Sequence, residues 1–252
     1  MSKCALITGA TSGFGKAIAI KFAKEGYDLI ITGRREERLN QLAQEIMDSY
    51  GNAVTALCFD VRNKAAVNES IESLGDKTVD VLINNAGLAS GLDLIQDGDT
   101  EDWDKMIDTN VKGLLYVSNQ IIPKMVDRGE GHIINIGSTA GKEVYQKGNV
   151  YCASKHAVDA ITKSMRIDLL PHGVKVTQIA PGAAETEFSI VRFHGDETKA
   201  KAAYNGYKPM TAEDIAEVTF YTTTLPAHLC INDVVMTSVA QANSHYIHRE
   251  QA

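Results

Sequence analysis

Short apolar runs alternate along the chain with longer segments in which apolar residues recur at helical spacing. The apolar runs are Cys4–Ile7, Leu29–Thr32, Val54–Phe59, Val79–Ile83, His132–Ile136, Val174–Ile179 and Asp233–Met236. The amphipathic segments between them include Gly13–Glu25, Glu36–Tyr50, Asn63–Leu74, Asp104–Arg128 and Val150–Leu170. Nearly continuous apolar strands that alternate with helices are typical of parallel sheets buried on both faces. The pattern therefore predicts an α/β fold, a doubly wound parallel sheet of about seven strands with helices on both faces.

The whole chain is expected to form a single domain, residues 1–252. A chain of 252 residues is long enough to bury a substantial core. We find no linker, repeat or abrupt change of composition that would divide it. Pro181-Gly182 ends the sixth predicted strand, and the segment that follows, about 183–210, is polar and lacks a clear periodicity. This segment is expected to be an irregular lid over the strand ends.

Composition narrows the class of partner. The formal net charge of −7 argues against a nucleic acid or an anionic membrane surface as the main partner. The four cysteines show no CxxC pair, and the chain runs from Met1-Ser2-Lys3 directly into an apolar strand with no sign of a cleavable leader. The seven histidines show no metal-ligand spacing, so no metal is expected. These features predict a cytoplasmic protein with reduced thiols.

A glycine-rich turn follows the first predicted strand. The turn contains Gly9, Gly13 and Gly15, and a helix is predicted to begin at once. Glycines allow backbone N–H groups to approach a pyrophosphate at the positive end of such a helix. A tight strand-to-helix turn needs glycine in any case, but its place after the first strand of an alternating pattern favours a dinucleotide.

The end of the second predicted strand indicates which dinucleotide. An NAD site requires an acidic residue there for the ribose 2′-hydroxyl. The candidate Asp28 lies at the wrong end of the strand, whereas Arg34 and Arg35 lie at the expected place. Arginine is matched to a phosphate by charge and by geometry, so NADP(H) is predicted. The alternative is that both arginines pair with Glu36 and Glu37 at a solvated helix start.

Two further strand ends carry residues with two readings each. Asp60, next to Val61, faces the adenine amino group or else caps the following helix. Asn84, Ala86 and Gly87 end the fourth predicted strand, where small residues and amides permit close approach of a cofactor or form an ordinary turn.

The catalytic chemistry is predicted from three residues. Ser138 lies at the end of the fifth predicted strand, and Tyr151 and Lys155 lie one turn apart on the same face of the next helix. A cation beside a phenol favours the phenolate, so Lys155 is expected to lower the pKa of Tyr151. Tyr151 then exchanges a proton with a substrate oxygen, and Ser138 stabilises developing charge on that oxygen.

These motifs together resemble the short-chain dehydrogenase/reductase family over nearly the whole chain. They occur in family order: Thr8-Gly9 with Gly13-Phe14-Gly15, Asn84-Asn85-Ala86-Gly87, Asn110, Ser138, Tyr151 with Lys155, and Pro181-Gly182. The resemblance implies a Rossmann-like fold in which Ser138, Tyr151 and Lys155 form the catalytic triad. It further implies that Asn110 holds a water of a proton relay from Lys155, that Lys155 also holds the nicotinamide ribose, and that Thr186 contacts the nicotinamide end. The residues expected to contact the cofactor are Gly9, Thr11, Ser12, Gly13, Phe14, Gly15, Arg34, Arg35, Asp60, Val61, Asn84, Ala86, Gly87, Tyr151, Lys155, Pro181, Gly182 and Thr186.

Substrate choice is predicted from the lid and from one branch of the family. The segments around Asn110, Ser138 and Arg192 are similar to the NADP-dependent 3-hydroxy acid dehydrogenases, which include serine and L-allo-threonine dehydrogenases and malonic semialdehyde reductases. An arginine that faces the pocket can hold a carboxylate and orient the 3-hydroxyl toward Tyr151. The alternative for Arg192 is a surface pair with Glu187 or Asp196.

Other features leave the substrate open. Branch members that reduce sulfonate aldehydes imply a role for Arg192 and Gln241 in holding a sulfonate. Lys142-Glu143, in the loop between Ser138 and Tyr151, either narrows substrate choice or faces water. The leading expectation is an NADP-dependent oxidoreductase that interconverts small 3-hydroxy acids (serine, L-allo-threonine or 3-hydroxypropionate) and 3-oxo acids. A reductase of sulfoacetaldehyde or other carbonyl compounds is the alternative, and a non-catalytic nucleotide-binding regulator is a third. The resemblance implies a homotetramer.

Overall fold

Successive side chains of the inner strands point to opposite faces of one sheet, and both faces are covered. In the computed structural model, which describes residues 2–250, Ala5 and Ile7 enter one hydrophobic core while Cys4 and Leu6 enter the other. Strands of this kind need helices on both sides, because each face must be removed from water. Full burial of each large apolar side chain stabilises the fold by about 1.5–3 kcal/mol.

The sheet contains seven parallel strands in the order β3-β2-β1-β4-β5-β6-β7. The strands are β1 (Cys4–Ile7), β2 (Asp28–Gly33), β3 (Val54–Cys58), β4 (Val81–Asn84), β5 (Gly131–Ile136), β6 (Val174–Pro181) and β7 (Asp233–Met236). The prediction of a seven-stranded, doubly wound parallel sheet is confirmed. The strand order reverses between β1 and β4, which is where ligands bind in sheets of this kind.

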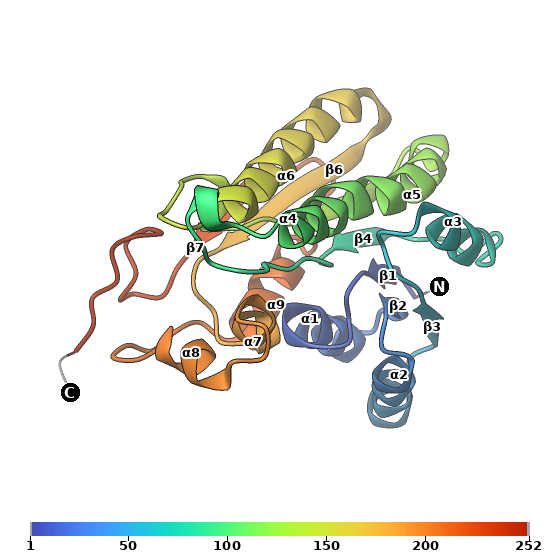
Figure 1. Cartoon of the computed structure of the whole chain (residues 1–252). Coiled ribbons are helices and arrows are strands. Elements are labelled where there is room, and N and C mark those ends of the chain that lie inside the picture. The colour runs from blue at the N-terminus through green and yellow to red at the C-terminus, as the bar shows by residue number, and fades with distance from the viewer. Residues whose placement is uncertain (1, 251–252) are drawn as a thin grey trace.

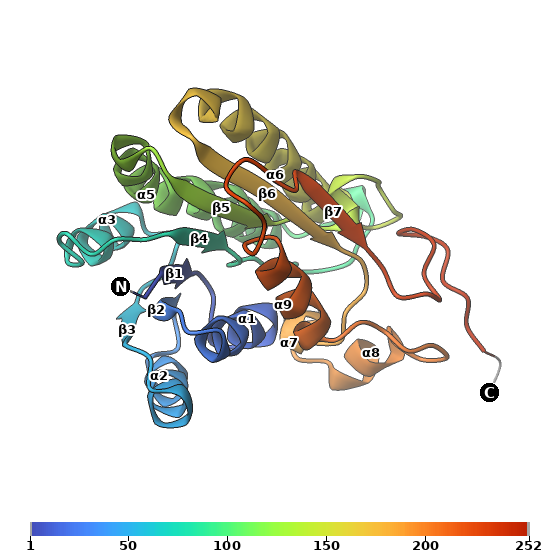
Figure 2. The same cartoon turned by 180° about the vertical axis from the view of Figure 1, so that it is seen from behind.

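Helices lie on both faces of the sheet, as Figures 1 and 2 show. The helices are α1 (Gly13–Lys24), α2 (Glu36–Tyr50), α3 (Lys64–Glu72), α4 (Thr100–Ile107), α5 (Leu114–Arg128), α6 (Asn149–Asp168), α7 (Glu187–Arg192), α8 (Glu197–Ala202) and α9 (Ala212–Tyr221). Short turns of 3₁₀ helix are η1 (Ile95–Asp97), η3 (Thr139–Gly141) and η4 (Leu170–His172), and η2 (Asp108–Gly113) is π-helical. One face carries α1, α2 and α9, and the other carries α3, α5 and α6.

Two segments differ from the sequence expectation. The helical stretch expected at Asp104–Arg128 begins earlier, at Thr100, and contains the wide turn η2 between α4 and α5. The lid, residues 183–210, was expected to be irregular but holds α7 and α8. Each of these helices has only six residues, which is too short for a recognisable periodicity. Thr186 and Asp196 start them by accepting hydrogen bonds from the N–H groups of Phe188 and Lys199.

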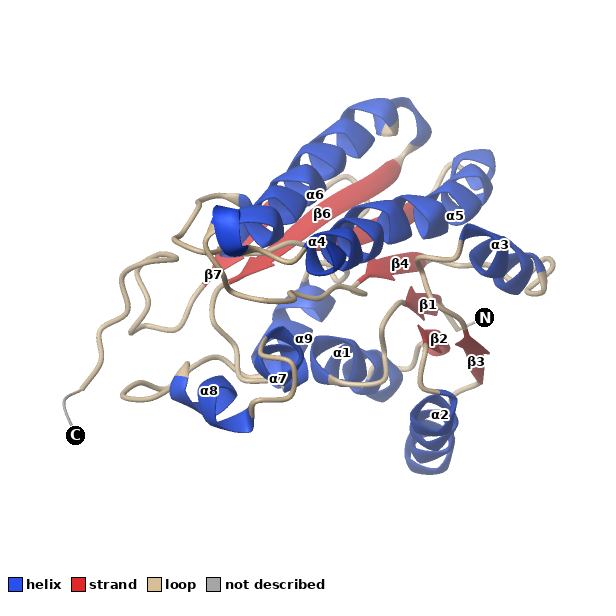
Figure 3. Ribbon diagram, in the orientation of Figure 1, coloured by secondary structure: helices blue, strands red, loops and turns tan. Residues whose placement is uncertain are grey.

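The carboxyl ends of β6 and β7, the lid and the C-terminal segment lie at the same edge of the molecule, and Figure 3 shows that mostly loops surround that edge. Among residues 2–250 there is no helix long and apolar enough to span a bilayer. Within the same residues no group of His, Cys, Asp and Glu side chains is arranged to bind a metal ion.

Candidate active site

A cavity of about 830 Å³ opens at the carboxyl ends of β1, β4, β5 and β6. It brings together most of the residues predicted from the sequence. Those in its wall are Gly9, Thr11, Ser12, Gly13, Phe14, Arg34, Arg35, Asp60, Val61, Ala86, Gly87, Ser138, Tyr151, Lys155, Pro181, Gly182, Thr186, Arg192 and Gln241. Three predicted residues, Gly15, Asn84 and Asn110, lie behind that wall and are described below with their contacts.

The glycine positions of the turn do not suit residues with side chains. Gly9 and Gly13 have φ angles of +68° and +51°, a region that L residues rarely adopt. A Cβ atom at Gly15 would lie 2.3 Å from the Gly9 carbonyl oxygen, so Gly15 acts by allowing the turn to close. The turn brings the N-terminus of α1, which has no acidic residue in its first turn, to the cavity. This arrangement fits a pyrophosphate.

The loops after β1 and β4 are fastened by Thr8 and Asn85, two residues of the family motifs for which the sequence predicted no individual role. The Thr8 hydroxyl accepts hydrogen bonds from the N–H groups of Asn85 (3.0 Å) and Ala86 (2.9 Å). The Asn85 amide donates to the Thr8 carbonyl oxygen at 2.8 Å. Both contacts join strand ends that are far apart in sequence, which is why the local pattern did not reveal them.

Asn84 does not line the cavity. Its side-chain amide donates to Ser118 Oγ (2.9 Å) and Asn135 Oδ1 (2.8 Å) in the buried layer between the sheet and α5. The predicted contact of the Asn84 side chain with a cofactor is therefore not supported, because this side chain points away from the cavity into the layer between the sheet and α5. Gly87 does approach the catalytic residues, since a Cβ atom there would lie 3.5 Å from Lys155 Nζ.

A group of arginines marks one end of the cavity. Arg35 donates to the hydroxyls of Thr11 (2.9 Å) and Ser12 (2.7 Å), and also to the carboxylate of Glu187 (2.9 Å). Arg38, one turn further along α2, donates to the same carboxylate at 2.9 Å. The alternative pairing of Arg34 and Arg35 with Glu36 and Glu37 is not found among residues 2–250.

The structure decides one of the two roles considered for Asp60, the cap of the following helix. The cap of α3 is Asn63, whose side chain accepts from the Ala66 N–H, so the capping role predicted for Asp60 is wrong. Asp60 instead forms ion pairs with Arg62 (2.7 Å) and Arg34 (3.6 Å) at the cavity wall. Its role toward an adenine stays a prediction. Together, the tight turn, the helix N-terminus and the arginines fit a dinucleotide that carries a 2′-phosphate.

The residues predicted to be catalytic come from the end of β5 and from α6. Ser138 follows β5, and its hydroxyl accepts from the Ala140 N–H at 3.1 Å. Tyr151 is buried on α6, and its ring packs edge-on against Phe188 of the lid at a centroid distance of 5.6 Å. Lys155 lies on the same helix, and its Nζ donates to the Ile136 carbonyl oxygen at 2.9 Å.

The pKa shifts differ from the expectation. Burial raises the pKa of Tyr151, and the groups that oppose this effect are the hydrogen-bonding Ser138 and the nearby Arg192 rather than Lys155. Burial lowers the pKa of Lys155 to about 8. The expected lowering of the Tyr151 pKa by Lys155 is therefore wrong for this arrangement, because burial has the largest effect and Lys155, whose ammonium donates to Ile136, is not among the groups that lower that pKa. The result is a phenol held protonated, together with an amine one helical turn further along α6 whose lowered pKa allows it to release a proton close to neutral pH.

Asn110 lies in the wide turn η2 and is 1% exposed. Its Oδ1 accepts from the Leu88 N–H (2.8 Å), and its Nδ2 donates to the Leu88 carbonyl oxygen (2.8 Å) and to Ser154 Oγ (2.9 Å). These bonds fasten the segment after β4 to the catalytic helix. Single π-helical turns frequently occur at functional sites, and the water-holding role of Asn110 stays a prediction.

Arg192, at the end of α7, lies over the ring of Tyr151. Its guanidinium lies 5.4 Å from the ring centre of Tyr145 and 5.5 Å from that of Tyr151, and it donates to the Tyr145 hydroxyl at 2.7 Å. Its Nε is buried and finds no hydrogen-bond partner among the described residues. The alternative surface pairing is wrong, because Glu187 pairs with Arg35 and Arg38, and Asp196 pairs with Lys199.

Gln241 reaches the cavity from the C-terminal segment. Its Oε1 accepts from the Ala183 N–H at 2.8 Å, and its Nε2 donates to the Asn243 carbonyl oxygen at 3.2 Å. Both polar atoms of the side chain therefore contact the backbone, and Gln241 fastens the start of the lid to the C-terminal segment.

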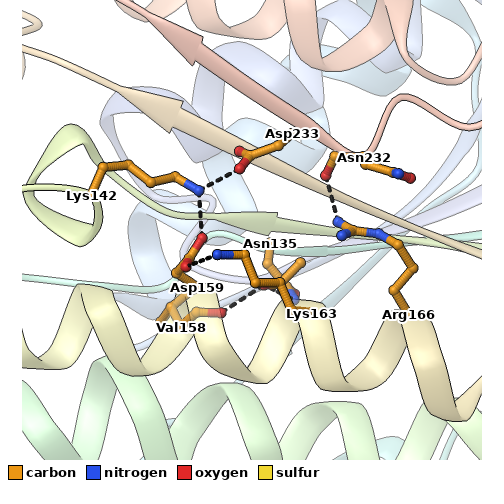
Figure 4. Close-up of polar contacts among 9 residues, drawn as sticks. Asn135, Lys142, Val158, Asp159, Lys163, Arg166, Asn232 and Asp233 are labelled. Atoms are coloured by element: carbon orange, nitrogen blue, oxygen red, sulfur yellow. Dashed lines mark hydrogen bonds and ion pairs between the residues drawn. The ribbon is translucent and has the colours of Figure 1, made fainter.

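Lys142 neither faces water nor points into the cavity. Figure 4 shows its ammonium between the carboxylates of Asp159 on α6 and Asp233 on β7, and Lys163 joined to the same Asp159 carboxylate. Burial by itself raises the pKa of Asp159, but hydrogen bonds from Lys142 and Lys163 outweigh it and lower that pKa. Glu143 accepts from the Ser244 N–H at 3.0 Å. Both residues thus fix the loop that follows Ser138.

The Lys142→Met variant is expected to lose about 1–3 kcal/mol of unfolding free energy, because two partly buried carboxylates lose a partner. The Asp159 part of that stabilisation is present above its unfolded pKa and disappears as the pH falls through the lowered folded pKa. The difference in unfolding free energy between Lys142→Met and the wild type should therefore become smaller below about pH 4. Thermal and urea unfolding between neutral and acidic pH measure it. Lys163→Met is the control, because this lysine is 58% exposed and should lose less than about 1 kcal/mol. Equal losses in the two variants would contradict the interpretation.

Comparison with known proteins agrees with the motifs and the geometry. The family model for short chain dehydrogenases matches residues 3–196. An NADP-dependent 3-hydroxy acid dehydrogenase YdfG of Salmonella typhi is 48% identical over 240 residues, 94% of this chain and 95% of that protein. Sulfoacetaldehyde reductase 2 of Chromohalobacter salexigens is 47% identical over 249 residues, 98% of each chain. The closed form of a serine dehydrogenase complexed with NADP⁺ superposes with a TM-score of 0.91 at 45% identity and covers 98% of this chain and 100% of its own. The chain belongs to the short-chain dehydrogenase family.

Proposed function

We propose that this protein is an NADP(H)-dependent oxidoreductase that interconverts small 3-hydroxy acids and the corresponding 3-oxo acids. One observation carries the substrate class: the Arg192 guanidinium, with a buried Nε that has no partner among residues 2–250, lies against the ring of Tyr151. An arginine placed there can hold a carboxylate by two parallel hydrogen bonds. The carbonyl or hydroxyl carbon of a short acid then lies beside the Tyr151 hydroxyl.

The proton chemistry follows from the groups in the cavity wall. Bound NADP(H) supplies or accepts the hydride. During reduction, Tyr151, whose pKa burial raises, donates its proton to the carbonyl oxygen, and the Ser138 hydroxyl donates a hydrogen bond to the same oxygen. Lys155, whose pKa burial lowers to about 8, can return a proton to the phenolate near neutral pH. In the oxidation direction the proton of Tyr151 would first pass to neutral Lys155, and the resulting phenolate would then take the proton of the 3-hydroxyl.

The glycine-rich turn and the arginines support NADP(H) as the cofactor. Arg35 already donates to the hydroxyls of Thr11 and Ser12 beside the N-terminus of α1. A 2′-phosphate at this end of the cavity meets Arg34 and Arg35, whereas no acid takes the place that an NAD ribose requires. The relatives named as NADP-dependent dehydrogenases agree with this choice.

The proposal is tested by following NADPH formation with L-serine, L-allo-threonine and 3-hydroxypropionate. Turnover with at least one of these acids is expected, and a neutral alcohol of the same length should be oxidised much more slowly, because it lacks a group for Arg192. Turnover with none of the three would overturn the substrate class.

A sulfonate is the second candidate, because a guanidinium binds sulfonate oxygens as well as carboxylate oxygens and one relative is named a sulfoacetaldehyde reductase. The kcat/KM values for 2-hydroxyethanesulfonate and 3-hydroxypropionate separate the two. A higher value for the sulfonate would assign the enzyme to sulfonate substrates.

We also propose a homotetramer in the cytoplasm. The long helices α5 and α6 lie side by side on one face. Two apolar side chains at the end of this face are exposed, Ile167 of α6 at 73% and Leu170, the first residue of η4, at 77%. Such apolar side chains are expected at a subunit interface. All four cysteines are free thiols, two of them exposed, which suits a reducing compartment. Light scattering measures the assembly.

A further inference from the structure

Glu187 links the lid to the arginines at the far end of the cavity. It is the first residue of α7. Each of its two carboxylate oxygens accepts a hydrogen bond from one arginine at the start of α2, Arg35 or Arg38, and both distances are 2.9 Å. The partners are about 150 residues away in the sequence. Both pairs lie in or beside the cavity wall rather than on a remote surface.

The carboxylate occupies donors that a 2′-phosphate would need. Arg35 uses Nη1 for Glu187, and uses Nε and Nη2 for the hydroxyls of Thr11 and Ser12. The pKa of Glu187 is lowered, because hydrogen bonds from Arg35 and Arg38 outweigh the opposing effect of burial. A phosphate that approaches Arg35 therefore meets an anion already bound to the same guanidinium, and two anions at one cation repel each other.

We propose that Glu187 is a specificity-determining residue that competes with the 2′-phosphate of the cofactor for Arg35 and Arg38 and so couples the lid to that phosphate. The proposal rests on the use of NADP(H) proposed above. In this proposal Arg38 joins Arg34 and Arg35 in binding the phosphate. Glu187 has the opposite effect and weakens phosphate binding.

The coupling to the lid follows from the shortness of α7. Its first residue, Glu187, is held by the arginines, and its last residue, Arg192, faces Tyr151. When a phosphate takes the arginines, Glu187 loses its partners and the first turn of α7 becomes free to move. By linkage, the factor by which a bound phosphate weakens the Glu187 contact equals the factor by which that contact weakens phosphate binding.

The test is isothermal titration of the full-length protein with adenosine 2′,5′-bisphosphate, which carries the 2′-phosphate but no nicotinamide. Glu187→Gln is expected to tighten its binding about five-fold or more, the usual lower range of such couplings. The gain should shrink at high salt, because it is electrostatic. Adenosine 5′-monophosphate, which lacks the 2′-phosphate, should bind equally to both proteins. Arg38→Gln should weaken binding of the bisphosphate.

Glu185→Gln is the matched control, because this lid carboxylate is exposed and forms no ion pair within the described chain. It should leave both affinities unchanged. Glu187→Ala serves as a second variant, and circular dichroism shows that each protein is folded. Unchanged or weaker bisphosphate binding in folded Glu187→Gln and Glu187→Ala would overturn the competition. If the wild-type protein bound the bisphosphate no better than the monophosphate, the proposed NADP(H) site itself would fail, which is a distinct result.

Discussion

Replacement of Tyr151 by phenylalanine is expected to lower kcat by about 10²–10⁴-fold, the usual contribution of a positioned general acid. The phenol is the buried hydroxyl that faces both Ser138 and Arg192, and burial keeps it protonated for donation to a carbonyl oxygen. The ring itself is retained, so its packing against Phe188 should persist. Single-turnover oxidation of NADPH with a 3-oxo acid measures the loss directly.

The affinity for NADPH should change little in this variant, because the glycine-rich turn and the arginines are untouched. Tyr221→Phe is a suitable control, since this tyrosine is 57% exposed on α9, away from the cavity wall. A folded Tyr151→Phe protein with undiminished turnover would remove the phenol from the mechanism. That outcome would favour a nucleotide-binding role without this catalysis.

Replacement of Arg192 by methionine is expected to lower kcat/KM for 3-hydroxy acids by about 10–10²-fold. The basis is the loss of charge-assisted hydrogen bonds to the carboxylate, worth about 1.5–3 kcal/mol. Most of the loss should be in KM, because the proposed role of Arg192 is to hold a part of the substrate that does not react. Steady-state kinetics with a hydroxy acid and with a neutral alcohol of similar size measure the effect.

The neutral alcohol is the internal control, since it offers the guanidinium no anion and should react equally poorly with both enzymes. The kcat/KM of Arg192→Lys for a 3-hydroxy acid should lie between those of the wild type and Arg192→Met, because lysine keeps the charge but lacks the planar guanidinium. Arg192 also lies over the Tyr151 ring. A proportional loss with the neutral alcohol would therefore show that the arginine acts on the tyrosine rather than on the carboxylate.

Much of the fold could be predicted from the sequence because its signals are local. Seven apolar runs define the seven strands. The inner strands are buried on both faces and must therefore be apolar at successive positions, whereas the edge strands β3 and β7 are only partly buried. The glycine-rich turn is similarly local: Gly9 and Gly13 require left-handed backbone angles, and Gly15 has no room for a Cβ. The helix face shared by Tyr151 and Lys155 follows from their spacing alone.

The hydrogen-bond and ion-pair partners of the site residues could be identified only from the tertiary structure. Arg192 bonds to Tyr145, Glu187 bonds to Arg35, and Lys142 bonds to Asp233. These residues are between 47 and 152 positions apart, so no local pattern could assign the pairs. Asn84 was predicted at the cofactor site but lies elsewhere. The sequence does not show to which face of the sheet a residue at a strand end points, and the Asn84 side chain bonds to Ser118 and Asn135.

The residue types of the site and their order along the chain were determined by the sequence itself, because strand ends, glycine turns and helix faces are properties of short segments. The direction of the Tyr151 and Lys155 pKa shifts was decided only by the folded molecule. A pKa depends on how much water and which charges surround a group, and the surroundings of Tyr151 are assembled from β5, the lid and the loop of Tyr145. Burial of the phenol exists only once those segments have packed together.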